Sequence, residues 1–198
     1  MNRNKTLLLQ GLIAITLTAF SSANAQDNPY PRVLIETTAG PITVELNPTR
    51  APLSVKNFLE YAESGFYEGT IFHRVVANFV IQGGGYTTDL KLKPTRPNIS
   101  NESGNGLSNL RGTVAMARTG DPHSADSQFF INLVNNDRLD PMPTRWGYAV
   151  FGEIVEGMDV VDDIGYGATG PSGPLAKDVP TVQVIIEKVS LLGAAEDE

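Results

Sequence analysis

The 198-residue chain contains no cysteine. This absence excludes disulfide bonds and thiolate metal sites, so the folded state depends on its hydrophobic core for stability. Positive charge is also scarce, since 15 Lys and Arg face 22 Asp and Glu, giving a formal net charge of −7. With this acidic balance, neither nucleic acid nor an anionic membrane is expected to be a main partner.

Histidine is nearly absent too, because His73 and His123 are the only two. A hydrolase could pair one of them with nearby serine and aspartate residues, namely Ser124, Ser127, Asp121 and Asp126. However, the sequence has no nucleophile-elbow motif, and two histidines without a spaced ligand motif do not form a zinc signature. The sequence therefore predicts no metal site and no cofactor.

A long apolar run occurs at the N-terminus. Residues 1–25 begin with basic residues, continue through Leu7–Phe20 and end in Ala23-Asn24-Ala25. This order is typical of a secretory signal peptide, and the run is shorter than the roughly 20 residues of a membrane span. We expect cleavage before Gln26, export to the periplasm (with secretion as the alternative) and no stable membrane insertion afterwards.

The remainder, 26–198, has the length of a single domain, with a core from about 32 to 192. The sequence contains no internal repeat, and no surface stripe suggests a partner, so we expect a monomer. The runs Arg32–Thr38 and Pro41–Asn47 predict a β-hairpin. A helix is expected from Pro52, with an apolar stripe at Val55, Phe58, Leu59 and Ala62 and a stop near Gly65.

For the rest of the chain, the sequence predicts short strands separated by polar loops. Further strands are predicted at Thr70–Val76, Phe79–Gln82, Thr113–Ala117, Gln128–Leu133, Ala149–Val155 and Val179–Leu192, with a short helix at Gly157–Ile164. Loops are predicted at Tyr86–Arg111, Thr119–Ser127, Asn135–Gly147 and Gly165–Asp178. Many short strands and two helices favour an all-β barrel or sandwich.

The stretch Ile71–Gly85 carries an arginine among apolar residues. Strand alternation predicts Phe72, Arg74 and Val76 on one face, opposite His73 and Val75. An unpaired buried charge is costly, which leaves two interpretations of Arg74. It forms a structural ion pair with an acid elsewhere, or it presents a guanidinium at the rim of an apolar groove.

Four blocks, in order along the chain, resemble the signature of the cyclophilins, the cyclosporin-binding peptidyl-prolyl cis-trans isomerases. The blocks are Phe72-His73-Arg74 with Phe79 and Gln82-Gly83-Gly84, then Gly112–Ala117, Ser127–Asn132 and Tyr148–Ile154. The resemblance extends from about Val33 to Leu191, and the short loops are most similar to those of bacterial exported members. It implies a closed eight-stranded antiparallel barrel capped by two helices, with the ligand groove on the outer surface of the barrel.

The resemblance also implies the activity, which is rotation of Xaa-Pro peptide bonds without a cofactor. The implied catalytic residues are Arg74, Phe79, Gln82 and Phe130. The implied substrate-binding residues are Val80, Ala117, Arg118, Gln128, Leu139 and Tyr148. Phe129 is expected to point inward, opposite to Phe130, because neighbouring strand residues face opposite sides.

Three positions depart from the family pattern. Arg138 stands where cyclosporin-sensitive members carry Trp, so weak cyclosporin binding is expected, while Val80 replaces Met and Arg118 replaces Asn. The predicted function is a prolyl isomerase that assists the folding of exported proteins and acts on proline-containing unfolded chains. The alternative is a chaperone or assembly module that binds proline segments with little turnover. Arg74 favours the isomerase, because proline binding alone requires the apolar pocket but not the arginine.

Overall fold

The computed structural model describes residues 29–193. The expected leader, its cleavage site before Gln26 and the acidic tail after Gly193 lie outside the described residues. The strands are β1 Arg32–Thr37, β2 Gly40–Leu46, β3 Thr70–Ile71, β4 Arg74–Val76, β5 Val80–Gly83, β6 Thr113–Met116, β7 Phe129–Asn132, β8 Val150–Glu156, β9 Thr169–Ser172, β10 Leu175–Pro180 and β11 Ile185–Leu192. The helices are α1 Pro52–Glu63 and α2 Met158–Tyr166, with a 3₁₀ turn at Asp137–Leu139.

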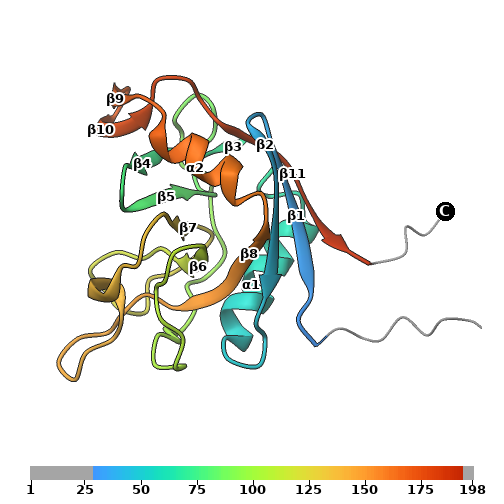
Figure 1. Ribbon diagram of the computed structural model, residues 1–198, viewed down its shortest axis with the longest axis vertical. Coiled ribbons are helices and arrows are strands. Elements are labelled where there is room, and N and C mark those ends of the chain that lie inside the picture. The colour runs from blue at the N-terminus through green and yellow to red at the C-terminus, as the bar shows by residue number, and fades with distance from the viewer. Residues whose placement is uncertain (1–28, 194–198) are drawn as a thin grey trace, which may run out of the picture.

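Nine strands form one strongly curled antiparallel sheet in the order β3-β11-β1-β2-β8-β6-β7-β5-β4 (Figure 1). The two strands at its ends, β3 and β4, are consecutive in the chain and are separated only by Phe72 and His73. The stretch pairs with β11 through its first half and with β5 through its second half. Counted as one strand, β3 and β4 close the sheet into an eight-stranded barrel. The all-β prediction is confirmed.

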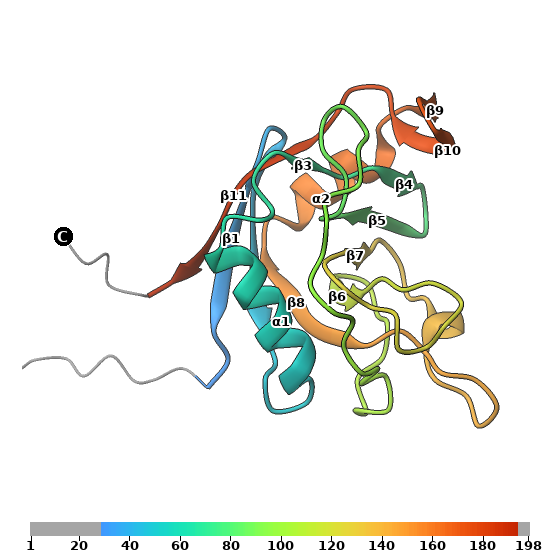
Figure 2. The same ribbon diagram turned by 180° about the vertical axis from the view of Figure 1, so that it is seen from behind.

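The two helices lie over opposite ends of the curled sheet (Figures 1 and 2). Helix α1 begins with Pro52, as predicted, and packs against β8 and β11 through residues that include Val55 and Phe58. Helix α2 packs against β2, β4 and β5 through Val161 and Ile164. No helix within residues 29–193 is both long and apolar enough to cross a bilayer.

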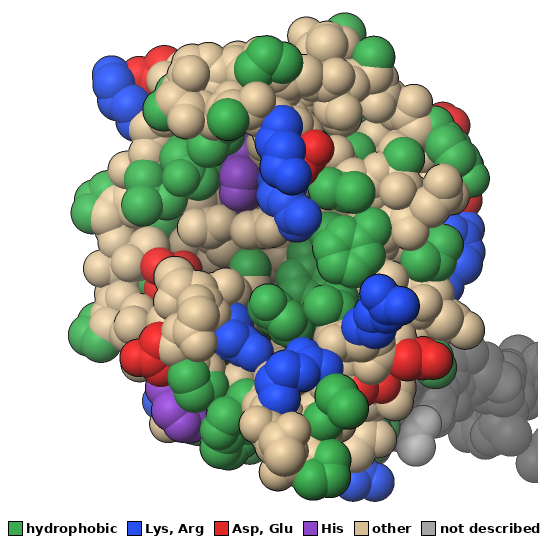
Figure 3. All heavy atoms as spheres, turned by 90° about the vertical axis from the view of Figure 1, so that its left-hand side faces the viewer, with side chains coloured by type: hydrophobic (Ala, Val, Ile, Leu, Met, Phe, Trp, Pro, Cys, Tyr) green, Lys and Arg blue, Asp and Glu red, His purple; other side chains and the backbone are tan. Residues whose placement is uncertain are grey.

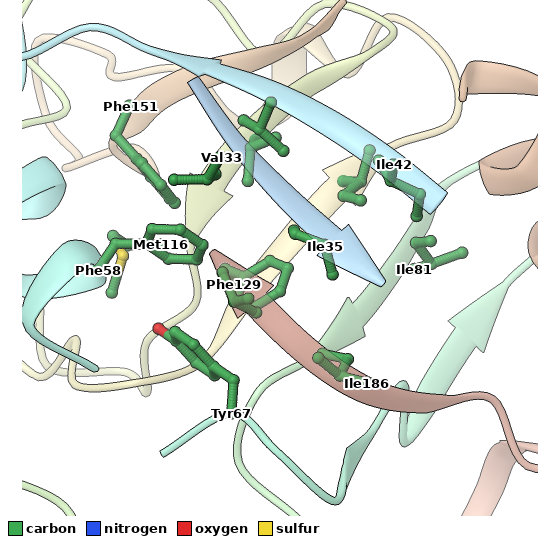
Figure 4. Packing of buried hydrophobic residues seen from close by; sticks show 14 of the residues in the cluster. Val33, Ile35, Ile42, Phe58, Tyr67, Ile81, Met116, Phe129, Phe151 and Ile186 are labelled. Atoms are coloured by element: carbon green, nitrogen blue, oxygen red, sulfur yellow. The ribbon is translucent and has the colours of Figure 1, made fainter. Parts of the chain in front are cut away.

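The barrel interior is filled by aliphatic and aromatic side chains (Figure 4). Phe129 meets Phe58 and Tyr67 edge-on, with ring centres 5.5 and 5.6 Å apart. This arrangement explains one glycine of the Gly83–Gly85 run, since Gly84 has φ +78° and a Cβ there would lie 2.9 Å from both Tyr67 and Phe129. Phe129 points inward, as expected.

The predicted faces of the Ile71–Gly85 stretch are partly wrong. Phe72 and Val75 both belong to the interior cluster, whereas Arg74 and Val76 are half-buried. The alternation breaks because the chain leaves strand geometry at Phe72 and His73, between β3 and β4.

The end of the domain also differs from expectation. The predicted surface loop Gly165–Asp178 contains a hairpin, formed by β9 and β10 around Gly173, which has φ +52°. The predicted strand Val179–Leu192 is divided, because β10 ends at Pro180 and β11 begins only at Ile185. Proline has no N–H to continue a ladder, and the hairpin sequence lacks the apolar alternation that signals a strand.

Candidate active site

The candidate site is built on one row of paired residues across the outer face of the barrel. Arg74 on β4 pairs with Gln82 on β5, Gln82 with Phe130 on β7, and Phe130 with Ala115 on β6. Directly paired residues on antiparallel strands have Cβ atoms about 4.5–5.5 Å apart. Strand register thus brings residues from distant parts of the sequence into contact.

This row borders a cavity of about 270 Å³. The cavity is lined by Arg74, Phe79, Val80, Gln82, Ala117, Arg118, Phe130, Leu139 and Tyr148. Every residue that the sequence predicted for the site is therefore in the lining, except Gln128. The floor of the cavity belongs to a small apolar cluster that is separate from the barrel interior. Figure 3 shows the hollow with hydrophobic side chains at its base and Lys or Arg side chains around it.

Arg74 is the charged member of the row. Its Nη1 donates to Gln82 Oε1 at 3.3 Å, its Nε lies 3.9 Å from Asp178 Oδ2, and its guanidinium carbon lies 5.9 Å from the centre of the Phe79 ring. A guanidinium carries five N–H donors, and the bond to Gln82 is the one it donates from its side chain within residues 29–193. Arg74 therefore fits both interpretations from the sequence: it has an acidic partner, as in a structural ion pair, and it keeps free N–H donors at the apolar groove.

Two glutamines extend the polar side of the groove. Gln82 Nε2 donates to Gln128 Oε1 at 3.1 Å, so Gln128 holds Gln82 from behind although it lies outside the cavity lining. The glycine at position 85 makes room for this arrangement, because a Cβ on Gly85 would lie 2.6 Å from Gln128 Cγ. A chain Gln128–Gln82–Arg74 therefore fixes the orientation of the arginine.

Arg118 occupies another side of the groove and is held differently. Its Nε, Nη1 and Nη2 donate to the carbonyl oxygens of Gly147, Thr119 and Trp146 at 3.2, 2.9 and 2.9 Å. Its guanidinium also lies 4.4 Å from the centre of the Tyr148 ring, which meets Phe130 edge-on at 5.6 Å. Arg118 therefore acts mainly as a brace for the groove wall.

Residues 32–191 match the family model described as cyclophilin type peptidyl-prolyl cis-trans isomerase/CLD. The chain belongs to the cyclophilin family. It is 47% identical to peptidyl-prolyl cis-trans isomerase A of Dickeya dadantii, over 96% of this chain and 98% of the relative. It is 52% identical to peptidyl-prolyl cis-trans isomerase B of Escherichia coli, over 80% of this chain and 98% of the relative.

Solved cyclophilins share the fold. A cyclophilin type peptidyl-prolyl cis-trans isomerase of Cryptosporidium parvum, crystallised in the presence of the dipeptide Ala-Pro, superposes with a TM-score of 0.65 at 27% identity, covering 81% of this chain and 98% of its own. Together with the family match and the named relatives, this makes the protein a peptidyl-prolyl cis-trans isomerase. Cyclophilin isomerases act on proline-containing peptides.

The histidines of this cyclophilin take no part in a hydrolytic arrangement. Ser124 Oγ donates to the Asp121 carbonyl, and His123 Nδ1 accepts from the Asn101 N–H. His73 lies beside Tyr86, with ring centres 4.6 Å apart, and burial lowers its pKa to about 4. Within residues 29–193, no group of three or more His, Cys, Asp or Glu side chains is placed to hold a metal ion.

Sequence reasoning missed two features of the site. The first is Asp178, which reaches Arg74 from β10, a segment predicted to be a loop. The second is the set of carbonyl oxygens that fix Arg118, contributed by Thr119, Trp146 and Gly147. Backbone carbonyls carry no sequence signal. An acidic partner was one interpretation of Arg74, but nothing in the sequence distinguishes Asp178 from the other acidic residues.

Proposed function

We propose that this groove catalyses rotation of Xaa-Pro bonds through Arg74, with the proline ring held against Phe79, Phe130 and Leu139. The observation that carries the proposal is the position of a guanidinium with free N–H donors at the rim of an apolar cavity. The cavity supplies the ring site, and the guanidinium supplies donors to the reacting amide.

Amide resonance opposes rotation with a barrier of about 18–20 kcal/mol. In the twisted state resonance is lost, so the proline nitrogen regains its lone pair and becomes a better hydrogen-bond acceptor. A donor that meets this nitrogen only in the twisted state lowers the barrier, because only interactions stronger in the transition state than in the ground state accelerate the step. No covalent bond is made or broken, and no proton carrier is needed.

The remaining residues hold the substrate and the arginine. Gln82 and Gln128 keep the guanidinium in one orientation, and Gln82 also faces the cavity, where it can bond the substrate backbone. Ala117 and Arg118 border the flanking backbone, while Val80 and Tyr148 form the walls beside the ring.

The test is cis/trans exchange of a short Ala-Pro peptide, followed by NMR with the chain from Gln26 and its Arg74→Ala variant. Uncatalysed exchange takes tens to hundreds of seconds, so acceleration is readily seen. We expect rapid exchange with the native protein and a loss of about 10²-fold or more in the variant. Full activity of a folded Arg74→Ala protein would refute the assigned role, and peptide binding without acceleration would favour the chaperone function.

The biological setting is part of the same proposal. We propose that the chain is exported by its N-terminal 25 residues to the periplasm, where it assists the folding of exported proteins as a monomer. Cell fractionation with N-terminal sequencing should find a periplasmic protein beginning at Gln26, and light scattering should give the mass of one chain. Arg138 is exposed and offers no indole, so cyclosporin should inhibit weakly.

A further inference from the structure

The guanidinium of Arg74 is contacted at two different edges. Gln82 accepts from Nη1 at 3.3 Å, whereas Asp178 Oδ2 lies 3.9 Å from Nε. The Asp178 side chain is 24% exposed and that of Arg74 is 38% exposed, so the pair is only partly screened by water. Within the described residues, the Arg74 side chain donates a hydrogen bond only through Nη1, so the N–H groups of Nη2 remain available as donors.

The backbone at Asp178 points to a use for its side chain. Asp178 has φ +64°, in the left-handed region that glycine adopts most readily. It lies in β10, where the pairing with β9 shifts register between Leu175 and Val179, and β10 packs beside β4. Aspartate tolerates this conformation better than most residues, and here the conformation places its carboxylate against the arginine of β4.

A second cation shares the same oxygen. Lys177 Nζ lies 3.8 Å from Asp178 Oδ2, but the Lys177 side chain is 82% exposed. An ion pair of so exposed a side chain contributes little, because water and salt screen it. Lys177 is therefore a natural control, being the residue before Asp178 and a contact of the same carboxylate.

We propose that Asp178 is a positioning residue for the isomerase reaction. Its carboxylate restrains the Nε edge of Arg74, while Gln82 restrains Nη1, and together they aim the remaining N–H donors into the groove. The β9–β10 hairpin then contributes to catalysis by supplying Asp178. This inference rests on the proposed role of Arg74.

The first experiment compares Asp178→Asn and Asp178→Gly with Lys177→Ala in the peptide-exchange assay. Asparagine and glycine both accept a positive φ, but neither carries a charge. We expect kcat to fall about 2- to 5-fold in both variants, the size of a partly exposed ion pair, with KM little changed. Lys177→Ala should match the native protein. A normal rate in Asp178→Gly would mean that only the backbone conformation matters, and would overturn the proposal.

A second experiment separates positioning from general destabilisation. In an Arg74→Lys background, Asp178→Asn should cause no further loss, because the group that it restrains is gone. With an uncharged peptide, added salt should lower the native rate toward that of Asp178→Asn and leave the variant unchanged. The Arg74 Nε–Hε signal in NMR should broaden or shift in Asp178→Asn.

The inference would be contradicted if Asp178→Asn lowered kcat equally in the native and Arg74→Lys backgrounds. It would also be contradicted if Asp178→Asn left both the Arg74 Nε–Hε signal and the native rate unchanged. The two proposals fail separately. If Arg74→Ala is inactive while Asp178→Asn has native activity, the proposed function stands and the positioning role falls. If Arg74→Ala is fully active, the assigned role of Arg74 falls first.

Discussion

In strands β4, β5 and β7, a residue that faces the barrel interior lies next to a residue that faces the groove. The interior residues are Val75, Ile81 and Phe129, and their sequence neighbours on the outer face are Arg74, Gln82 and Phe130. The inner residues contact other apolar side chains, while the outer ones face a cavity, where Arg74 donates to Gln82 and the Phe130 ring meets Tyr148 edge-on. Alternation therefore allows one patch of sheet to support both stability and chemistry.

The comparison predicts that substitutions one residue apart have different consequences. Changes on the inner face should lower the free energy of unfolding, and changes on the outer face should lower the rate of isomerisation. The four predictions below test this separation in order of expected size.

The largest effect is expected for Phe129→Ala. This fully buried ring contacts Phe58, Tyr67 and Phe72, so its removal leaves a cavity in the barrel. The free energy of unfolding should fall by about 3–5 kcal/mol, measured by urea denaturation. Gln82→Ala, on the outer face, is the control and should unfold near the native midpoint. A loss below about 1 kcal/mol for Phe129→Ala would show that the interior repacks without cost.

Arg74→Lys should have the largest effect on the outer face. Lysine keeps the charge but loses the planar fork that contacts Gln82 and Asp178 together. We expect kcat/KM to fall about 10²-fold with an unchanged urea midpoint, because this side chain is partly exposed and outside the interior. Near-native activity would show that a point charge suffices and that the geometry of the guanidinium is unimportant.

Much of this division could be predicted from the sequence. The motifs around Arg74, Gln82 and Phe130 identified the groove, and alternation placed Phe129 inside. The first prediction came from the cyclophilin resemblance and the second from strand alternation; the structure places Arg74, Gln82 and Phe130 at one cavity and buries Phe129 in the interior.

Other features depend on contacts that no local pattern encodes. The inward turn of Phe72 follows from a two-residue break between β3 and β4 that apolar alternation does not reveal. The β9–β10 hairpin lacks an apolar face, since it lies at the surface beside β4. The approach of Asp178 to Arg74 joins residues more than 100 positions apart, so only the folded chain shows it.

The third prediction concerns His73, whose titration should affect the fold rather than the groove. Burial lowers its pKa from 6.5 to about 4, and the neighbouring charge of Arg74 acts in the same direction. The unfolded state therefore binds more protons below pH 6.5, and stability falls as the pH drops from 6.5 toward 4. The loss attributable to His73 at pH 5.5 is on the order of 1 kcal/mol. His73→Gln should remove this part of the pH dependence, whereas the exposed His123→Gln should keep it. An identical pH dependence in His73→Gln would contradict the assignment.

The smallest effect is expected for Gly85→Ala, which tests whether the groove can be altered through Gln128, a residue outside the cavity lining. Gly85 does not require a positive φ, but an added Cβ would lie 2.6 Å from Gln128 Cγ and 3.0 Å from its Nε2. Gln128 must then move, and its bond to Gln82 weakens, so Arg74 loses part of its support. We expect kcat/KM to fall about 5-fold with little change in stability, since misplacement of a catalytic group lowers the rate without unfolding the protein. Gly104→Ala is the matched control, because a Cβ there meets nothing within 4 Å. If Gly85→Ala instead lowers the free energy of unfolding and leaves kcat/KM intact, Gln128 supports the barrel interior rather than the groove. The groove face would then be confined to residues that line the cavity itself.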